Sequence, residues 1–332
     1  FITTPRDIVR LANTLSVTYP AVEGEVNPVD FIAIETLRVF CPVVYDTIRK
    51  NRKAFAGHSN TSGYFGPGVD DLKSFHNSLL DRVQKEDKEP IKRLLRRIFP
   101  KLEAVWGNTH YGARESTWRK QLRVCSPDIF PVYFRLVIPE GSISNAEMKA
   151  ILALASNPKS FGAKLVELAN QKRPDSTTRV RTFLERLEDY TEKEIPSEHI
   201  PSIVQALFDI GDQLLLPEDE PRGILDFGND IRIGRIIWQL LRRLDETRRF
   251  EVLKEAVSKG NAIATIVREV TTFGQQHGKY GADQPRPEED KLISAQHLQE
   301  LEKIALKKIR DAAQEDFLLP VSYTHLTLPT KA

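Results

Sequence analysis

The chain has 332 residues, of which 40% are hydrophobic and 28% are charged, so it can bury a core and is not typical of a disordered protein. Its 48 basic and 46 acidic side chains give a formal net charge of +2, which argues against a protein that binds polyanions with its whole surface. Only two cysteines are present, Cys41 and Cys125, which excludes a disulfide scaffold and a four-cysteine zinc site. No apolar run approaches the roughly 20 residues that span a bilayer, and no leader-like segment is seen, so we expect a cytoplasmic protein.

Helix start signals dominate the first fifty residues. Thr4 precedes Pro5 and Asn27 precedes Pro28, and each pair combines an N-cap with a first-turn proline. Pro42 predicts the start of a third helix. We therefore predict a small helical domain over residues 1–57.

A Gly-rich segment over residues 58–68 predicts a linker and a domain boundary, and residues 69–320 are predicted to form a C-terminal helical region. One stretch, Ile129–Ile138, has the composition of a strand, although Pro131 argues against a central strand and leaves a turn of helix as the alternative. Helices are predicted at about 69–83, 89–102, 118–127, 145–154, 159–172, 176–193, 198–216, 230–245, 248–259, 261–275 and 288–316. The predicted fold class is all-α, with a small helical domain, the part that the resemblance given below implies is a helical lid, followed by a multi-helix array and little or no sheet.

Both ends of the sequence are unusual. The chain begins with Phe1 and contains a single methionine, Met148, so we expect that the natural start lies upstream. Residues 321–332 do not continue the charged helix before them, and Val321–Thr330 resembles translated sequencing adapter. We expect this tail to be non-native, with a genuine short apolar tail as the alternative.

Most catalytic signatures are absent from the sequence. The segment nearest to a phosphate loop, Gly274–Tyr280, is one residue too short and has tyrosine where serine or threonine must reach the metal, so we interpret it as a loop between helices. No HExxH motif occurs, and the seven histidines are scattered. Cys125 has no histidine at a suggestive spacing and is predicted to be a buried thiol. We therefore expect neither a catalytic residue nor a metal site in these 332 residues.

Two basic segments are candidates for binding anions. One predicted helix places four basic side chains on one face, and such a stripe could follow a phosphate backbone. Its members are Lys92, Arg93, Arg96 and Arg97. The alternative is an ordinary solvated helix face. The segment Trp106–Arg123 interleaves aromatic and basic residues, which suits stacking on nucleotide bases, but core packing is the alternative.

The first predicted helix places Arg6 and Arg10 four residues apart, near its start and on one face. Two guanidinium groups projecting from a small helical domain can bind phosphate oxygens through paired hydrogen bonds. The spacing alone is weak evidence, because Asp7 or another carboxylate could neutralise either charge.

Three segments together resemble the end of the KAP family of P-loop NTPases. They are TTPRDIVRLANTLSVTYPAV (3–22), VNPVDFIAIETLRVFCPVVYDTIRKNRKAF (26–55) and LRVCSPDIFPVYFRLVIPEGSISNAE (122–147). The resemblance covers roughly the first 150 residues and implies an α/β NTPase core upstream, a helical lid and a C-terminal helical region. The sequence departs from the family pattern because the phosphate loop, its lysine and the magnesium-binding acidic strand are missing.

The resemblance implies that the full protein binds ATP and Mg²⁺ and hydrolyses ATP, and that Arg6 and Arg10 are lid arginines near the γ-phosphate. It also implies a regulatory or scaffolding role, which in some bacterial relatives belongs to defence against phage. The expected partners are the upstream NTPase core and a protein bound by the helical region; the fragment alone should not hydrolyse ATP. The alternative is a helical scaffold that binds nucleic acid or protein without nucleotide chemistry.

Overall fold

The computed structural model describes residues 2–57, 69–107, 114–191, 194–223, 226–282 and 284–314. These residues form seventeen α-helices and seven short 3-10 helices, and within them the only β-structure is an isolated bridge between Lys172 and Thr178. The prediction of an all-α fold is confirmed. No helix in this part of the chain is long and apolar enough to cross a membrane. The predicted linker (58–68) and the predicted non-native tail (321–332) lie outside the described residues.

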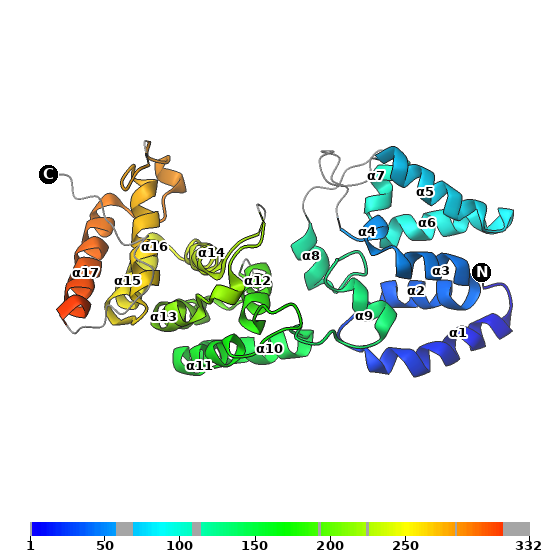
Figure 1. The fold of residues 1–332 in the computed structure, drawn as a ribbon, viewed down its shortest axis with the longest axis horizontal. Helices are drawn as coiled ribbons and strands as arrows, with labels where there is room; N and C mark the ends of the chain where they lie inside the picture. The colour runs from blue at the N-terminus through cyan, green and yellow to red at the C-terminus, as the bar shows by residue number, and fades with distance from the viewer. Residues whose placement is uncertain are drawn as a thin grey trace. The chain divides into compact units, whose positions relative to one another are not determined.

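The chain divides into two compact units, Phe1–Ala146 and Glu147–Ala332 (Figure 1). The first unit contains α1 (Pro5–Thr18), α2 (Pro28–Phe40), α3 (Pro42–Lys50), α4 (Arg52–Phe55), α5 (Val69–Asp81), α6 (Lys88–Ile98), α7 (Lys101–Gly107), α8 (Glu115–Lys120) and α9 (Phe130–Arg135).

The helix starts predicted from the proline signals are confirmed. Thr4 caps α1 in a capping box, since its hydroxyl accepts from the Asp7 backbone N–H while the Asp7 carboxylate accepts from the Thr4 N–H at 3.0 Å. Asn27 caps α2 by accepting from the N–H groups of Val29 and Asp30. Since the side chain of each cap satisfies backbone donors that the helix leaves free, the sequence fixes these starts locally.

The predicted domain boundary at 58–68 is corrected by the core of the first unit. One hydrophobic cluster contains side chains from before and after this segment, among them Phe31, Phe55, Phe99 and Tyr133, which are all fully buried. Residues 1–57 therefore do not pack as a domain of their own, because their apolar faces are buried by α5, α6 and α9. The compact units divide after Ala146 instead.

Of the two alternatives for Ile129–Ile138, the turn of helix is confirmed, since Phe130–Arg135 form the short helix α9. Pro131 lies in its first turn, where the missing N–H costs nothing, and Leu136 ends it in the left-handed region at φ 53°. The single helix predicted over 89–102 is also corrected. It is interrupted at Phe99, whose extended backbone precedes Pro100, and α6 and α7 are separate helices.

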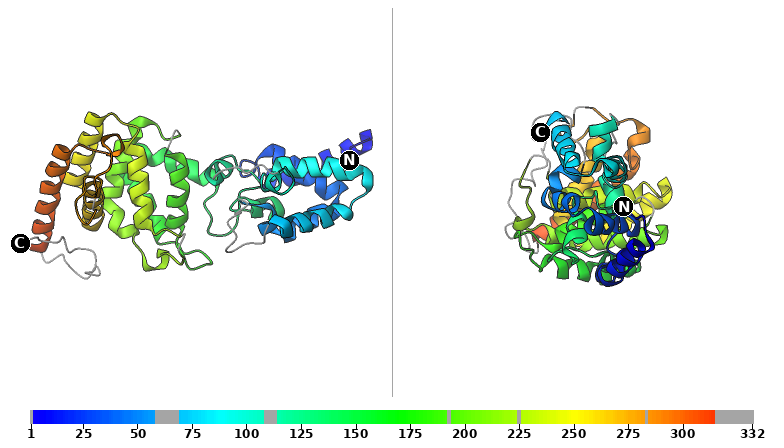
Figure 2. Two further views of the ribbon diagram at one scale, coloured as in Figure 1. Left: turned by 90° about the horizontal axis from the view of Figure 1, so that it is seen from above. Right: turned by 90° about the vertical axis from the view of Figure 1, so that its right-hand side faces the viewer.

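The second unit is built of paired helices, which lie side by side in both Figure 1 and Figure 2. Helix α13 packs against α11 and α15, α12 packs against α14, and α17 packs against α15 and α16. The helices that follow α9 are α10 (Asn145–Ala153), α11 (Pro158–Ala169), α12 (Arg179–Tyr190), α13 (Ile200–Ile210), α14 (Asn229–Leu241), α15 (Glu246–Lys259), α16 (Ile263–Gln276) and α17 (Ala295–Gln314). Fully buried Leu, Ile, Val and Phe side chains from these helices form the core of this unit.

Candidate functional site

The two predicted lid arginines lie on the exposed face of α1. Arg6 has no hydrogen-bond or ion-pair partner among the described residues, and the Arg10 guanidinium lies 5.4 Å from the centre of the Phe40 ring. Asp7, which could have neutralised one of them, accepts from Thr3 and Thr4. Both guanidinium groups are therefore accessible to a ligand.

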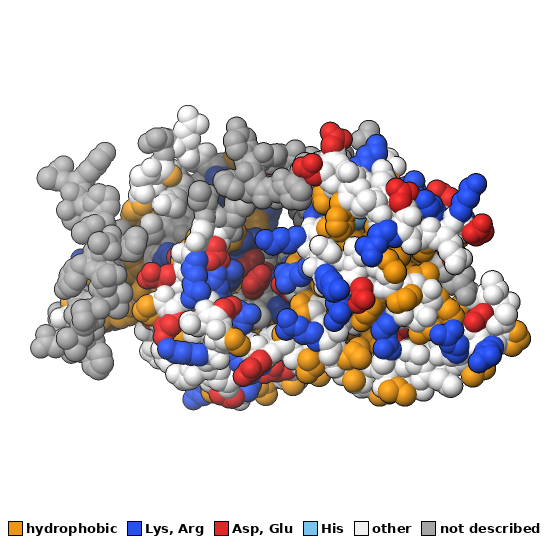
Figure 3. Space-filling model, turned by 45° about the vertical axis from the view of Figure 1, so that its right-hand side comes forward, with side chains coloured by type: hydrophobic (Ala, Val, Ile, Leu, Met, Phe, Trp, Pro, Cys, Tyr) orange, Lys and Arg blue, Asp and Glu red, His pale blue; other side chains and the backbone are white. Residues whose placement is uncertain are grey.

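Apolar side chains share this outer face of α1. Helical spacing places Val9 and Val17 in the same sector as Arg6 and Arg10, and their exposed fractions are 56% and 77%. The opposite side of α1, which contributes Leu11, faces the core, so Val9 and Val17 do not belong to the core. Figure 3 shows a face of the molecule on which apolar side chains lie among Lys and Arg.

The predicted basic stripe of α6 is partly neutralised inside the protein. Arg96 forms an ion pair of 2.5 Å with Glu103, and the Lys92 ammonium lies 5.5 Å from the centre of the Trp106 ring. Arg93 and Arg97 have exposed side chains. Two of the four cations are therefore engaged in contacts within the first unit, which weakens the stripe as a phosphate-binding surface.

The aromatic and basic residues of Trp106–Arg123 serve largely as packing. The Trp118 side chain is buried, and Trp106 donates its indole N–H to Asn77 at 3.1 Å. Arg123 binds the buried Asp30 carboxylate. Residues 108–113 lie outside the described ranges. The alternative of core packing is favoured for the part that is described.

The segment Gly274–Tyr280, interpreted from the sequence as a loop between helices, forms the last turn of α16 and the turns that follow it. Gly274 and the residues that follow end α16, and Tyr280 packs so closely that a Cβ atom at position 274 would lie 2.3 Å from its ring. Tyr280 donates its hydroxyl to Glu302 at 2.7 Å. No group of three or more His, Cys, Asp or Glu side chains suited to a metal occurs among the residues that the structure describes.

The second unit contains a groove, which the sequence analysis did not identify. It is an open cavity of about 440 Å³ between α14 and α16. The residues that line it are Asp230, Ile231, Gly234, Arg235, Trp238, Gln239, Arg268, Glu269, Thr272, Phe273, Gln276 and Arg286. Aromatic, charged and amide side chains are thus brought together by helices that are about thirty residues apart in sequence.

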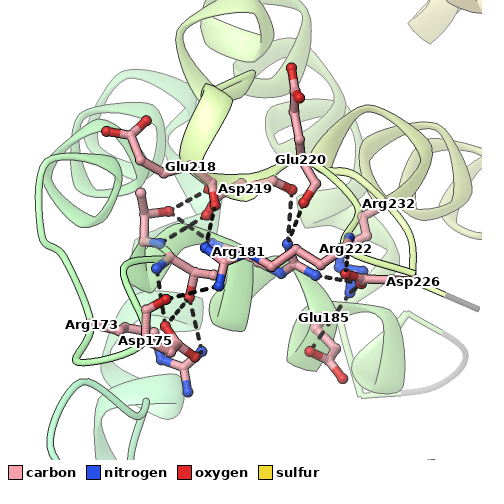
Figure 4. Close-up of polar contacts among 12 residues, drawn as sticks. Arg173, Asp175, Arg181, Glu185, Glu218, Asp219, Glu220, Arg222, Asp226 and Arg232 are labelled. Carbon is pink, nitrogen blue, oxygen red and sulfur yellow. Dashed lines mark hydrogen bonds and ion pairs between the residues drawn. The ribbon is translucent and has the colours of Figure 1, made fainter.

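A polar network fixes the α14 wall of this groove to α12 (Figure 4). Asp219 is nearly fully buried and accepts from the Thr178 N–H and from Asn229 Nδ2, both at 2.8 Å. Arg181 donates to the Asp219 carbonyl oxygen at 2.9 Å and binds the Asp226 carboxylate. Since Asn229 is the first residue of α14, these bonds set where that wall begins.

The α16 wall is fixed by the start of the same connecting segment. Asp212, in the 3-10 helix Gly211–Leu214, accepts from the N–H groups of Ala264 and Thr265 at 2.9 and 2.8 Å and so satisfies free donors at the N-terminus of α16. The segment between α13 and α14 therefore positions both walls of the groove through hydrogen bonds to the first turns of α14 and α16.

Glu269 is the least expected residue in the groove. Its side chain is almost fully buried, it accepts from Arg268 at 3.1 and 3.2 Å, and burial raises the pKa of its carboxyl. Gly234 makes room for it, because a Cβ atom at position 234 would lie 2.9 Å from Glu269 Oε1. A glycine in the middle of an otherwise apolar helix pattern was the one sequence signal for this close approach.

Comparisons of the chain with models of protein families, with curated proteins and with solved structures find no match.

Proposed function

We propose that residues 1–320 form the lid and the helical regulatory region of a KAP-like P-loop ATPase. In this proposal Arg6, with Arg10 beside it, approaches the γ-phosphate of ATP held with Mg²⁺ by a nucleotide-binding core outside these residues. The C-terminal helical unit binds a protein partner. The proposed location is the cytoplasm, in keeping with Cys41 and Cys125, which are both free thiols.

The observation that supports the lid role is the composition of the outer face of α1. Exposed valines normally occur singly, but here Val9 and Val17 share a face with Arg6 and Arg10, which no described carboxylate neutralises. Such a face suits a surface that is covered when the lid closes. An arginine there would act by stabilising the charge that builds on the transferring phosphoryl group.

The alternative of a nucleic-acid-binding scaffold has less support. A site for a phosphate backbone needs several free cations, whereas Lys92 and Arg96 of the α6 stripe are engaged by Trp106 and Glu103. Only Arg93 and Arg97 remain exposed there.

ATP turnover by the full-length protein tests the lid role. We expect Arg6→Ala to lower turnover about tenfold or more, as loss of a charge-stabilising donor does, with unchanged thermal stability because the side chain is exposed. Arg52→Ala is the matched control, since Arg52 is also an exposed helical arginine of the first unit. Equal turnover in the wild type and in the Arg6→Ala variant would remove Arg6 from the site. A complete gene without a GxxxxGK[ST] loop would overturn the whole proposal.

A further inference from the structure

One face of α16 supplies the floor of the groove between α14 and α16. Glu269, Phe273 and Gln276 follow one another at positions i, i+4 and i+7 and therefore lie on one side of the helix. Their exposed fractions are 2%, 1% and 3%. All three line the groove although almost all of their surface is buried.

Two of these side chains each keep one polar atom without a hydrogen-bond partner in the part of the chain that the structure describes. Glu269 Oε1 accepts both hydrogen bonds from Arg268, and Gln276 Oε1 accepts from the Leu292 N–H at 2.9 Å. Within the described ranges, Glu269 Oε2 accepts no hydrogen bond and Gln276 Nε2 donates none. Neither of these two atoms is among the buried polar atoms that lack a partner, so both keep contact with solvent, and the groove offers an acceptor at one end and a donor at the other.

The spacing of Glu269 and Gln276 along the axis of α16 matches an extended peptide. Seven residues of α-helix rise about 10.5 Å, which is the length of about three residues of extended chain. A backbone N–H at the Glu269 end and a backbone carbonyl oxygen at the Gln276 end would satisfy both groups. Between them, Phe273 and Trp238 provide a surface on which an apolar side chain can pack.

The charges around the groove are uneven along its length. Near the Glu269 end Arg268 lies 3.3 Å from Asp230, and on the α14 wall Arg235 lies 3.3 Å from Glu188, so these arginines are neutralised. At the Gln276 end the Arg286 backbone N–H donates to the Gln276 carbonyl oxygen at 2.9 Å. The Arg286 side chain is exposed and has no ion-pair partner among the described residues. An acidic side chain would complement the groove at that end.

We propose that this groove binds an extended segment of a partner protein in which an apolar residue is followed by an acidic one. One backbone N–H of the segment faces Glu269, and its acidic side chain faces Arg286. A protein segment fits better than a nucleic acid, because one unpaired arginine cannot follow a phosphate backbone. The inference deepens the partner-binding role proposed for this unit and is independent of the role proposed for α1.

Selection from a phage-displayed library of random twelve-residue peptides on the immobilised chain tests this inference. We expect enrichment of peptides with an apolar residue followed by Asp or Glu. A selected peptide, synthesised with a fluorescent label, should lose at least about tenfold in affinity for the Arg286→Glu variant, and selection on that variant should favour Lys or Arg at the same position. Thr272→Trp, which places bulk on the groove wall, should abolish binding.

The matched control is Arg248→Glu, a charge reversal at an exposed arginine of α15 that should leave the affinity unchanged. Circular dichroism of each variant verifies its fold. Two results would overturn the inference: no enrichment above the bare support, or selected peptides that bind the Arg286→Glu and Thr272→Trp variants as well as the wild type. Neither result bears on ATP turnover, so failure here is distinguishable from failure of the lid role.

Discussion

Arg123 donates its Nε–H to the Asp30 carboxylate at 2.6 Å, although 93 positions separate the two residues. The same carboxylate oxygen accepts from the Val124 N–H at 3.0 Å. Asp30 is almost fully buried on α2, and this burial raises the pKa of its carboxyl in spite of Arg123. The pair joins α2 to the segment between α8 and α9, so it holds together the parts of the first unit on either side of residues 58–68.

Replacing Asp30 by alanine should destabilise the first unit strongly. The substitution leaves the half-buried Arg123 guanidinium and the Val124 N–H without their acceptor, which costs on the order of 3 kcal/mol in the free energy of unfolding. Urea denaturation measures this change. Asp46→Ala breaks an exposed pair with Arg49 and should cost about 1 kcal/mol or less. Equal losses in the free energy of unfolding for the two substitutions would show that the buried pair contributes no more to stability than the exposed pair.

Replacing Glu269 by glutamine should stabilise the protein increasingly as the pH rises. Because burial raises the pKa of Glu269 in the folded state, the folded chain retains a proton that the unfolded chain releases above its pKa of 4.5. Folding stability of the wild type therefore falls as the pH rises from 4.5 through the folded-state pKa. The variant lacks this loss, so urea denaturation should show a difference at pH 7.5 that shrinks toward pH 4.5.

Glu255→Gln is the control for this experiment. Lys259 lies 2.6 Å from the exposed Glu255 carboxylate and lowers the pKa of that carboxyl. Removing the Glu255 charge should therefore lower the free energy of unfolding slightly at pH 7.5, whereas Glu269→Gln should raise it. If Glu269→Gln lowered stability equally at both pH values, its carboxylate would be a net stabilising partner of Arg268 instead.

Local signals in the sequence predicted a large part of the fold. The starts of α1 and α2 were readable because Thr4 and Asn27 bind backbone groups within their own first turns. Strand and helix stayed open as alternatives at Ile129–Ile138, because apolar composition alone cannot separate a short buried helix from a strand. The contacts that bury this helix are distant in sequence: the Tyr133 hydroxyl, for example, accepts from the Asn27 N–H at 2.9 Å.

The groove was not predictable from the same signals. Glu269 and Trp238 belong to helices that the sequence analysis placed correctly, but their meeting depends on Asp219 and Asp212, which fix the helix starts from a loop. Such contacts between side chains far apart in sequence leave no periodic pattern. Asp212 lies within the helix predicted over 198–216, and Asp219 lies in the break predicted after it, so neither residue stood out in the sequence.

Lowering the pH should reduce the folding stability of the protein because of His76. The ring is buried against Phe55, Phe75 and Trp106, its Nε2 lies 3.2 Å from the Ala54 carbonyl oxygen, and burial lowers its pKa to about 4. Below the unfolded-state pKa of 6.5 the unfolded chain binds a proton that the folded chain does not. His76 therefore accounts for a loss of about 2 kcal/mol between pH 7.5 and pH 5.

His76→Phe should remove most of this acid sensitivity, although losing the bond to Ala54 lowers stability by about 1 kcal/mol at pH 7.5. Urea denaturation at pH 7.5 and pH 5 measures both effects. Phe75→Leu disturbs the same cluster but keeps the imidazole, so this control should be less stable at both pH values and retain the acid loss. An unchanged pH dependence in the His76→Phe variant would place the titrating group elsewhere.

Both cysteines should resist alkylation in the folded protein. Burial raises the pKa of Cys125 to about 12 and that of Cys41 to about 11, the latter with help from Asp87, both from 9.0. Since the thiolate is the nucleophile, a rise of about two pKa units at Cys41 lowers its thiolate fraction at pH 7.5 roughly a hundredfold. Iodoacetamide followed by mass spectrometry should show slow labelling of Cys41 and none of the fully buried Cys125, whereas in 6 M urea, the matched reference, both should react rapidly. Rapid labelling of Cys125 under native conditions would mean that the core around α9 opens, because no path from solvent reaches that thiol in the closed structure.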